Sequence, residues 1–209
     1  MKPLTWTLFF LFAGLSASLG FAQGRTIICL GDSLTAGYGL REEMAYPHLV
    51  ERELREQGLE ITFINAGISG STTASGKARL QWLLKAHGNP EVLLLALGAN
   101  DGLRGQDLQK AKDHLESIIV LAKSKGIKVL LAGMRIPSNY GVAYSRQFEL
   151  MYGELAKLHQ LPLIPFLLEN VALQPEMNLP DGLHPNAKGH EEMAKTVLTH
   201  LRPLLKDPT

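Results

Sequence analysis

Three side chains in this sequence have the types that nucleophilic catalysis at a carbonyl group requires, although they lie far apart in the chain. Ser33 follows a short apolar run, and Asp181 and His184 stand three residues apart near the C-terminus. A serine hydroxyl becomes an effective nucleophile when an imidazole accepts its proton and a carboxylate holds that imidazole. A spacing of three residues brings a carboxylate within reach of an imidazole. Taken singly, Ser33 also fits a helix cap, and the Asp181–His184 pair also fits a turn.

The segments around these residues predict how they are positioned. Residues 26–30 are apolar or β-branched without helical spacing, which predicts a strand buried on both faces. Gly31 ends this strand, and Asp32 is expected to act as a turn and cap residue before the next helix. Further strands are predicted at 59–64, 92–97, 127–132 and 163–166, and helices at 44–57, around 80–84, and at 107–125, 144–159 and 188–205.

Strands and helices alternate along the chain without hairpin signals, which predicts an α/β fold with a five-stranded parallel sheet and helices on both faces. Pro165 in the last predicted strand indicates that this strand lies at an edge. In a parallel sheet the carboxyl ends of the strands open on one edge, where ligands bind. We therefore expect Ser33, the loop at Ser69–Gly70, the pair Asn100–Asp101 and the Asp181–His184 pair to converge.

Composition limits the classes of function. The 209 residues suit one domain, and a net charge of +1 with both signs scattered gives no indication of nucleic acid or an anionic membrane. The single cysteine, Cys29, excludes an intramolecular disulfide and is expected to be a small buried apolar residue. No His/Cys cluster or pair of carboxylates has the spacing of a metal site.

Residues 1–22 are predicted to be a signal peptide, and residues 23–209 the mature domain. Lys2 precedes a mostly apolar run at 4–15, and small residues lead to Ala22, which is an acceptable cleavage point before Gln23. The run is shorter than the ~20 residues of a membrane span, so we expect a periplasmic or secreted protein without a stable membrane anchor. An uncleaved N-terminal anchor is the alternative.

Two better-known motifs are absent. Residues 70–77 resemble a phosphate-binding loop, but five residues separate its glycines and Ala78 follows the lysine, so the spacing fails. The G-x-S-x-G nucleophile elbow does not occur, which argues against the α/β-hydrolase fold proper.

Four short motifs, taken in order, resemble those of the SGNH (GDSL) hydrolase family. They are residues 31–34 (GDSL), Gly70 in 65–70 (NAGISG), residues 98–101 (GAND) and residues 181–184 (DGLH). The stretches 98–105 and 134–141 look like those of the bacterial periplasmic thioesterase, lysophospholipase and arylesterase group. The resemblance covers the whole mature chain and implies a three-layer α/β/α, flavodoxin-like fold that hydrolyses acyl esters and thioesters.

The resemblance also implies a role for each motif residue. Ser33 would be the nucleophile, His184 the general base and then the general acid, and Asp181 the group that orients His184. The oxyanion hole would consist of the backbone N–H groups of Ser33 and Gly70 and the side-chain amide of Asn100. No cofactor or metal is implied. Ala99 departs from the group, which often has a second glycine there.

Apolar residues in two loops are predicted to bind the acyl part of the substrate. They are Leu103, Ile136, Pro137 and Tyr140, with Gly105 and Gly141 beside them. The expected partner is a small acyl ester or thioester, and the sequence gives no indication of protein partners. Two alternatives stay open: an esterase that removes O-acetyl groups from carbohydrates, and a non-catalytic binding module on the same fold.

Overall fold

A computed structural model describes residues 25–206, and the predicted signal peptide lies outside these residues. Five strands form one parallel sheet in the order β2-β1-β3-β4-β5. The strands are β1 (Arg25–Gly31), β2 (Ile61–Gly67), β3 (Val92–Ala96), β4 (Lys128–Ala132) and β5 (Leu163–Ile164). The prediction of a five-stranded parallel sheet in an α/β fold is confirmed.

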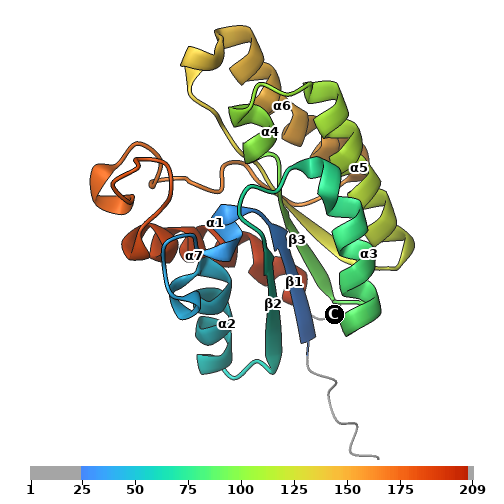
Figure 1. The fold of residues 1–209 in the computed structure, drawn as a ribbon. Coiled ribbons are helices and arrows are strands. Elements are labelled where there is room, and N and C mark those ends of the chain that lie inside the picture. Colours follow the sequence, from blue (N-terminus) through green and yellow to red (C-terminus); the bar gives the residue numbers. More distant parts are fainter. Residues whose placement is uncertain (1–24, 207–209) are drawn as a thin grey trace, which may run out of the picture.

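Helices cover both faces of this sheet and complete three layers (Figure 1). On one face α2 (Tyr46–Glu56) packs against α7 (Ala187–Leu201), and on the other α5 (Leu108–Ser124) packs against α3 (Gly76–His87) and α6 (Val142–His159). A helix start was predicted at Asp32 and Ser33, and the structure shows the short helix α1 (Ser33–Ala36) there, whereas the short helix α4 (Ala99–Leu103) was not predicted. Short 3₁₀ segments occur at Glu42–Met44, Thr73–Ser75, Ser138–Tyr140, Pro175–Met177 and Arg202–Leu205.

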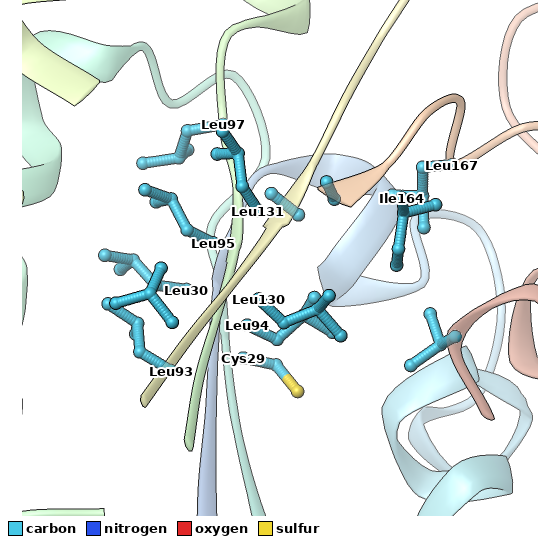
Figure 2. Close-up of a cluster of buried hydrophobic side chains, with 14 of the residues drawn as sticks. Cys29, Leu30, Leu93, Leu94, Leu95, Leu97, Leu130, Leu131, Ile164 and Leu167 are labelled. Carbon is cyan, nitrogen blue, oxygen red and sulfur yellow. The ribbon is translucent and has the colours of Figure 1, made fainter. Parts of the chain in front are cut away.

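The core lies on both sides of the central strands because their side chains are apolar at every position. In the sheet register Cys29 is the partner of Leu94, and Leu94 is the partner of Leu130. Figure 2 shows these three side chains on one side of the sheet and Leu93 and Leu95 on the other. All five are fully buried, as a strand covered on both faces requires. Burial strongly raises the pKa of the Cys29 thiol, as expected for a buried apolar cysteine.

Several element ends differ from the prediction by up to about four residues, for example β2, predicted at 59–64 and observed at Ile61–Gly67, and proline explains two of these differences. β5 ends at Ile164 instead of continuing to residue 166, because Pro165 has no N–H to donate to a neighbouring strand. The last α-helix ends at Leu201, and the chain continues as a 3₁₀ turn that contains Pro203. Within residues 25–206, no helix is long and apolar enough to cross a membrane.

The carboxyl ends of the strands bring the predicted site residues to one edge of the sheet. Gly31 at the end of β1 is in register with Gly67 of β2 and Ala96 of β3, so the three following loops leave the sheet side by side. Residues 165–186, which we call the C-terminal loop, lead from β5 to α7 and carry Asp181 and His184. In Figure 1 the short helices α1 and α4 lie at this edge.

Candidate active site

Ser33 is held at the sheet edge by a tight turn that leads directly into α1. Gly31 is required in this turn, because a Cβ there would lie 1.9 Å from the side-chain oxygen of Thr35. Asp32 caps α1 by accepting a 3.0 Å hydrogen bond from the backbone N–H of Leu34, which confirms its predicted role as a cap. Ser33 is therefore the first residue of α1, with its backbone N–H at the open start of the helix.

His184 and Asp181 lie beside Ser33, although about 150 residues separate them in sequence. His184 Nε2 lies 3.1 Å from Ser33 Oγ, and His184 Nδ1 lies 2.7 Å from Asp181 Oδ2. The other carboxylate oxygen of Asp181 accepts the backbone N–H groups of Leu183 and His184, both at 2.9 Å. These hydrogen bonds lower the pKa of Asp181 from 3.8 to about 2, so it is an anion at neutral pH.

The C-terminal loop is closed on itself around this pair. The backbone N–H of Leu179 donates to the carbonyl of His184 at 2.7 Å, and Asn178 forms an isolated bridge with Pro185. The side-chain amide of Asn178 donates to the carbonyls of Val171 and Gln174, both at 2.7 Å. These bonds fix the loop although it contains no long helix or strand.

Gly70 and Asn100 border the same space. Gly70 has a φ of 79°, which favours glycine, and no described residue accepts a hydrogen bond from the backbone N–H of Gly70 or of Ser33. The Asn100 amide donates one hydrogen bond to the carbonyl of Ser71 at 3.0 Å, which leaves its second N–H free for another acceptor. The three predicted donors thus lie on three loops at one edge of the sheet.

A buried carboxylate that sequence reasoning left without a role ties two of these loops together. Asp101 accepts the backbone N–H of Thr73 at 2.9 Å and the Thr73 hydroxyl at 2.7 Å. Thr73 lies three residues after Gly70, and Asp101 is next to Asn100, so this contact fixes the distance between the two loops. The Thr73 hydroxyl also meets His114 Nδ1 at 3.2 Å on α5.

Next to Ser33 and His184 lies a cavity of about 360 Å³ with a mostly apolar lining. Of the residues predicted to bind substrate, Leu103, Ile136 and Pro137 line this cavity. Tyr140 does not: it belongs to a 3₁₀ turn beyond Pro137 and is 41% exposed. Six further lining residues were not predicted, because the path of the loops brings them to the cavity: Tyr38, Met134, Phe166, Leu168, Leu173 and Leu183.

Two buried titratable groups lie near His184, and burial shifts both. Burial raises the pKa of Asp32 to about 6, against the opposing effects of the Leu34 hydrogen bond and the charges of His184 and Arg79. Burial lowers the pKa of His190 to about 4, and the charge of His184 acts in the same direction. His190 Nδ1 accepts the backbone N–H of Tyr46, so its neutral form joins α7 to α2. Among residues 25–206, no group of three metal-ligating side chains occurs.

A parallel α/β sheet with a hydroxyl, an imidazole and a carboxylate in line at its carboxyl edge has the geometry that serine hydrolases use. Residues 29–192 match the GDSL-like lipase/acylhydrolase family, and the chain belongs to this family. It is a carboxylic ester hydrolase, and the alternative of a non-catalytic binding module is set aside. The resemblance to SGNH hydrolases inferred from the sequence is confirmed.

Two relatives match nearly the whole chain. An arylesterase of Vibrio mimicus is 40% identical over 201 residues, which cover 96% of this chain and 98% of the relative. Thioesterase 1/protease 1/lysophospholipase L1 of Escherichia coli K12 is 38% identical over 200 residues, covering 96% of this chain and 94% of the relative.

Solved structures share the fold. The crystal structure of TesA superposes with a TM-score of 0.83 at 36% identity, covering 87% of this chain and 100% of that one. The structure of the psychrotrophic esterase EstA from Pseudoalteromonas sp., inhibited by monoethylphosphonate, also has a TM-score of 0.83, at 31% identity, covering 88% of this chain and 100% of the other.

Proposed function

We propose that this protein hydrolyses acyl esters and thioesters through an acyl-enzyme formed on Ser33. The observation that carries the proposal is the continuous line from Ser33 Oγ to His184 at 3.1 Å and from His184 to Asp181 at 2.7 Å. The names of the relatives, arylesterase and thioesterase/lysophospholipase, support the substrate class.

In the first half-reaction Ser33 Oγ forms a bond to the carbonyl carbon, and its proton passes to His184 Nε2. The carbonyl electron pair moves to the oxygen, which accepts hydrogen bonds from the N–H groups of Ser33 and Gly70 and from the Asn100 amide. The tetrahedral intermediate then collapses, the bond to the leaving oxygen or sulfur breaks, and the leaving group takes the proton from His184. Asp181 holds Nδ1 throughout and balances the charge of the imidazolium.

In the second half-reaction His184 removes a proton from water, whose oxygen attacks the acyl carbon. Collapse of the second intermediate returns the proton to Ser33 Oγ and releases the acid. We also propose that the protein works outside the cytoplasm, because Lys2 followed by the apolar run at 4–15 is the pattern of a signal peptide.

Replacing the nucleophile tests the proposal directly. Ser33→Ala removes the only atom that bonds to the acyl group, so we expect ester turnover to fall by about 10⁴-fold or more. A fluorophosphonate should label Ser33 in the parent with loss of fluoride and should not label the variant. Circular dichroism of both proteins should agree. An alanine variant with turnover near that of the parent would exclude the serine mechanism.

The apolar cavity supports acyl chains longer than acetyl. Burying one methylene contributes about 0.8 kcal/mol, so kcat/KM for p-nitrophenyl esters should rise by at most about fourfold per methylene from acetyl towards medium chains. Leu103, Ile136 and Pro137 would supply the contacts. A strict preference for acetyl, with butyryl and hexanoyl esters rejected, would instead identify an esterase for carbohydrate O-acetyl groups.

A further inference from the structure

The aromatic ring of Tyr38 lies against the imidazole of His184. The two ring centroids are 4.4 Å apart, and the ring planes are tilted by 36°. Tyr38 is 50% exposed and lines the cavity beside Ser33. None of the steps proposed above uses this residue, although it covers one face of the base.

The backbone around Tyr38 is built to hold the ring at this place. Gly37 and Gly39 on either side have φ values of 75° and 77°, in the region that favours glycine. A Cβ at Gly37 would lie 2.7 Å from the Ala45 Cβ, and one at Gly39 would lie 2.8 Å from a methyl group of Leu179. The backbone N–H of Tyr38 donates to the carbonyl of Ser33 at 3.1 Å. The loop is thus attached to the nucleophile and passes close to the C-terminal loop.

The chemistry of His184 gives this contact a consequence. When Nε2 takes the proton from Ser33, both ring nitrogens carry a hydrogen and a positive charge spreads over the imidazole. Asp181 balances that charge in the plane of the ring, at Nδ1. A cation within about 6 Å of an aromatic face is attracted by the electrons of that face, whereas a neutral imidazole is attracted much less. The distance of 4.4 Å is well inside this limit.

We infer that Tyr38 is a positioning residue that stabilises the imidazolium form of His184 through the face of its ring. The inference rests on the proposed role of His184 as the base. Because the charge develops on the way to the transition state, the contact lowers the barrier more than it strengthens substrate binding. The phenol hydroxyl has no part in this effect, and the aromatic ring alone is required.

The first test compares two variants that differ in the ring. Tyr38→Phe keeps the aromatic face and should retain kcat within about twofold of the parent, whereas Tyr38→Leu should lower kcat about tenfold. KM should change less than about threefold in both, since the effect belongs to the charged state. Trp82→Leu removes another exposed aromatic side chain, on α3 and outside the cavity beside Ser33, and should leave kcat unchanged. A Tyr38→Leu variant as active as the parent would overturn the inference.

A second test separates the electronic effect from packing. Phenylalanine analogues with one, two, three or four ring fluorines at position 38 keep the shape of the ring but progressively remove negative charge from its face. If the ring stabilises a cation, the logarithm of kcat should fall stepwise with the number of fluorines. If the ring only fills space, kcat should stay constant along the series, and the inference fails.

Different results would contradict the proposed function and the role of Tyr38. His184→Ala and Ser33→Ala test the proposed function, and full activity in either variant would remove the basis for both proposals. Loss of activity in those two variants, together with a flat fluorine series, would leave the proposed function intact and exclude the role of Tyr38.

Discussion

Two carboxylates interact electrostatically with the same histidine, His184, and their surroundings differ in almost every respect. Asp181 lies in the exposed C-terminal loop and is 2.7 Å from His184 Nδ1, whereas Asp32 lies at the end of β1 and is 1% exposed. Hydrogen bonds lower the pKa of Asp181 to about 2, and burial raises the pKa of Asp32 to about 6. Residue type alone therefore does not say which carboxylate takes part in the chemistry.

The difference follows from how many donors each carboxylate meets. Asp181 is exposed, accepts two backbone N–H groups and faces the imidazole, so its negative charge is well stabilised. Within residues 25–206, the Asp32 carboxylate accepts one hydrogen bond, from the backbone N–H of Leu34, and this bond does not compensate for the loss of water. A carboxylate that stays ionised can balance an imidazolium, whereas a buried one with a single donor serves mainly as a helix cap.

Of the two carboxylates, Asp181 gives the larger expected effect when its charge is removed. Asp181→Asn keeps one oxygen to accept backbone N–H groups but places an amide opposite His184 Nδ1, so the imidazole no longer holds the tautomer that accepts the Ser33 proton. We expect kcat/KM on p-nitrophenyl butyrate to fall by about 10³ to 10⁴-fold. The free energy of unfolding in urea should change by less than about 1 kcal/mol, because the side chain is exposed.

Glu176→Gln provides the matched control for this variant. Glu176 is an exposed carboxylate in the same loop, and only its backbone carbonyl is hydrogen bonded, to the Asn186 amide. Its replacement should leave both kcat/KM and stability unchanged. If Asp181→Asn loses less than about tenfold in kcat/KM, Asp181 is not the partner that fixes His184.

Local sequence patterns were enough to predict the strands and the position of Ser33. The strands were predictable because runs such as 92–97 are apolar at every position, and the position of Ser33 follows from the strand and turn before it. The convergence of Asn100 with Ser33 follows from the parallel arrangement. The length of α1 and the existence of α4 were not predicted, because four or five residues are too few to show a helical period.

The path of the C-terminal loop could not be predicted from local sequence patterns. The three-residue spacing of Asp181 and His184 predicted their contact, but the path of the loop depends on long-range hydrogen bonds such as those of Asn178. Leu173 and Leu183 reach the cavity by that path, and Tyr140 stays outside it. Tyr38 and His184 are also far apart in the sequence, and no local sequence pattern predicts that their rings are in contact.

The smaller expected effect concerns Asp32, and it is a change in stability instead of a change in activity. A carboxyl whose pKa is higher in the folded than in the unfolded protein stabilises the fold while it is protonated, and that stability is lost as the pH rises through the folded pKa. For Asp32 the ordinary value is 3.8 and the folded value about 6. Ionised Asp32 therefore lowers the free energy of unfolding above about pH 6, by about 3 kcal/mol.

Asp32→Asn removes this charge while keeping an oxygen that can cap α1. At about pH 8 we expect the variant to be more stable than the parent by about 1–3 kcal/mol, with the lower end set by Arg79, which loses its anionic neighbour. The difference should shrink as the pH falls below about 6 and approach zero near about pH 3, where Asp32 is protonated in both the folded and the unfolded protein. Urea unfolding at several pH values measures this difference in stability.

Asp101→Asn is the control: Asp101 is equally buried but accepts two hydrogen bonds from Thr73, so this variant should be less stable than the parent. A stability difference for Asp32→Asn that is independent of pH would show that its carboxylate is not the destabilising charge.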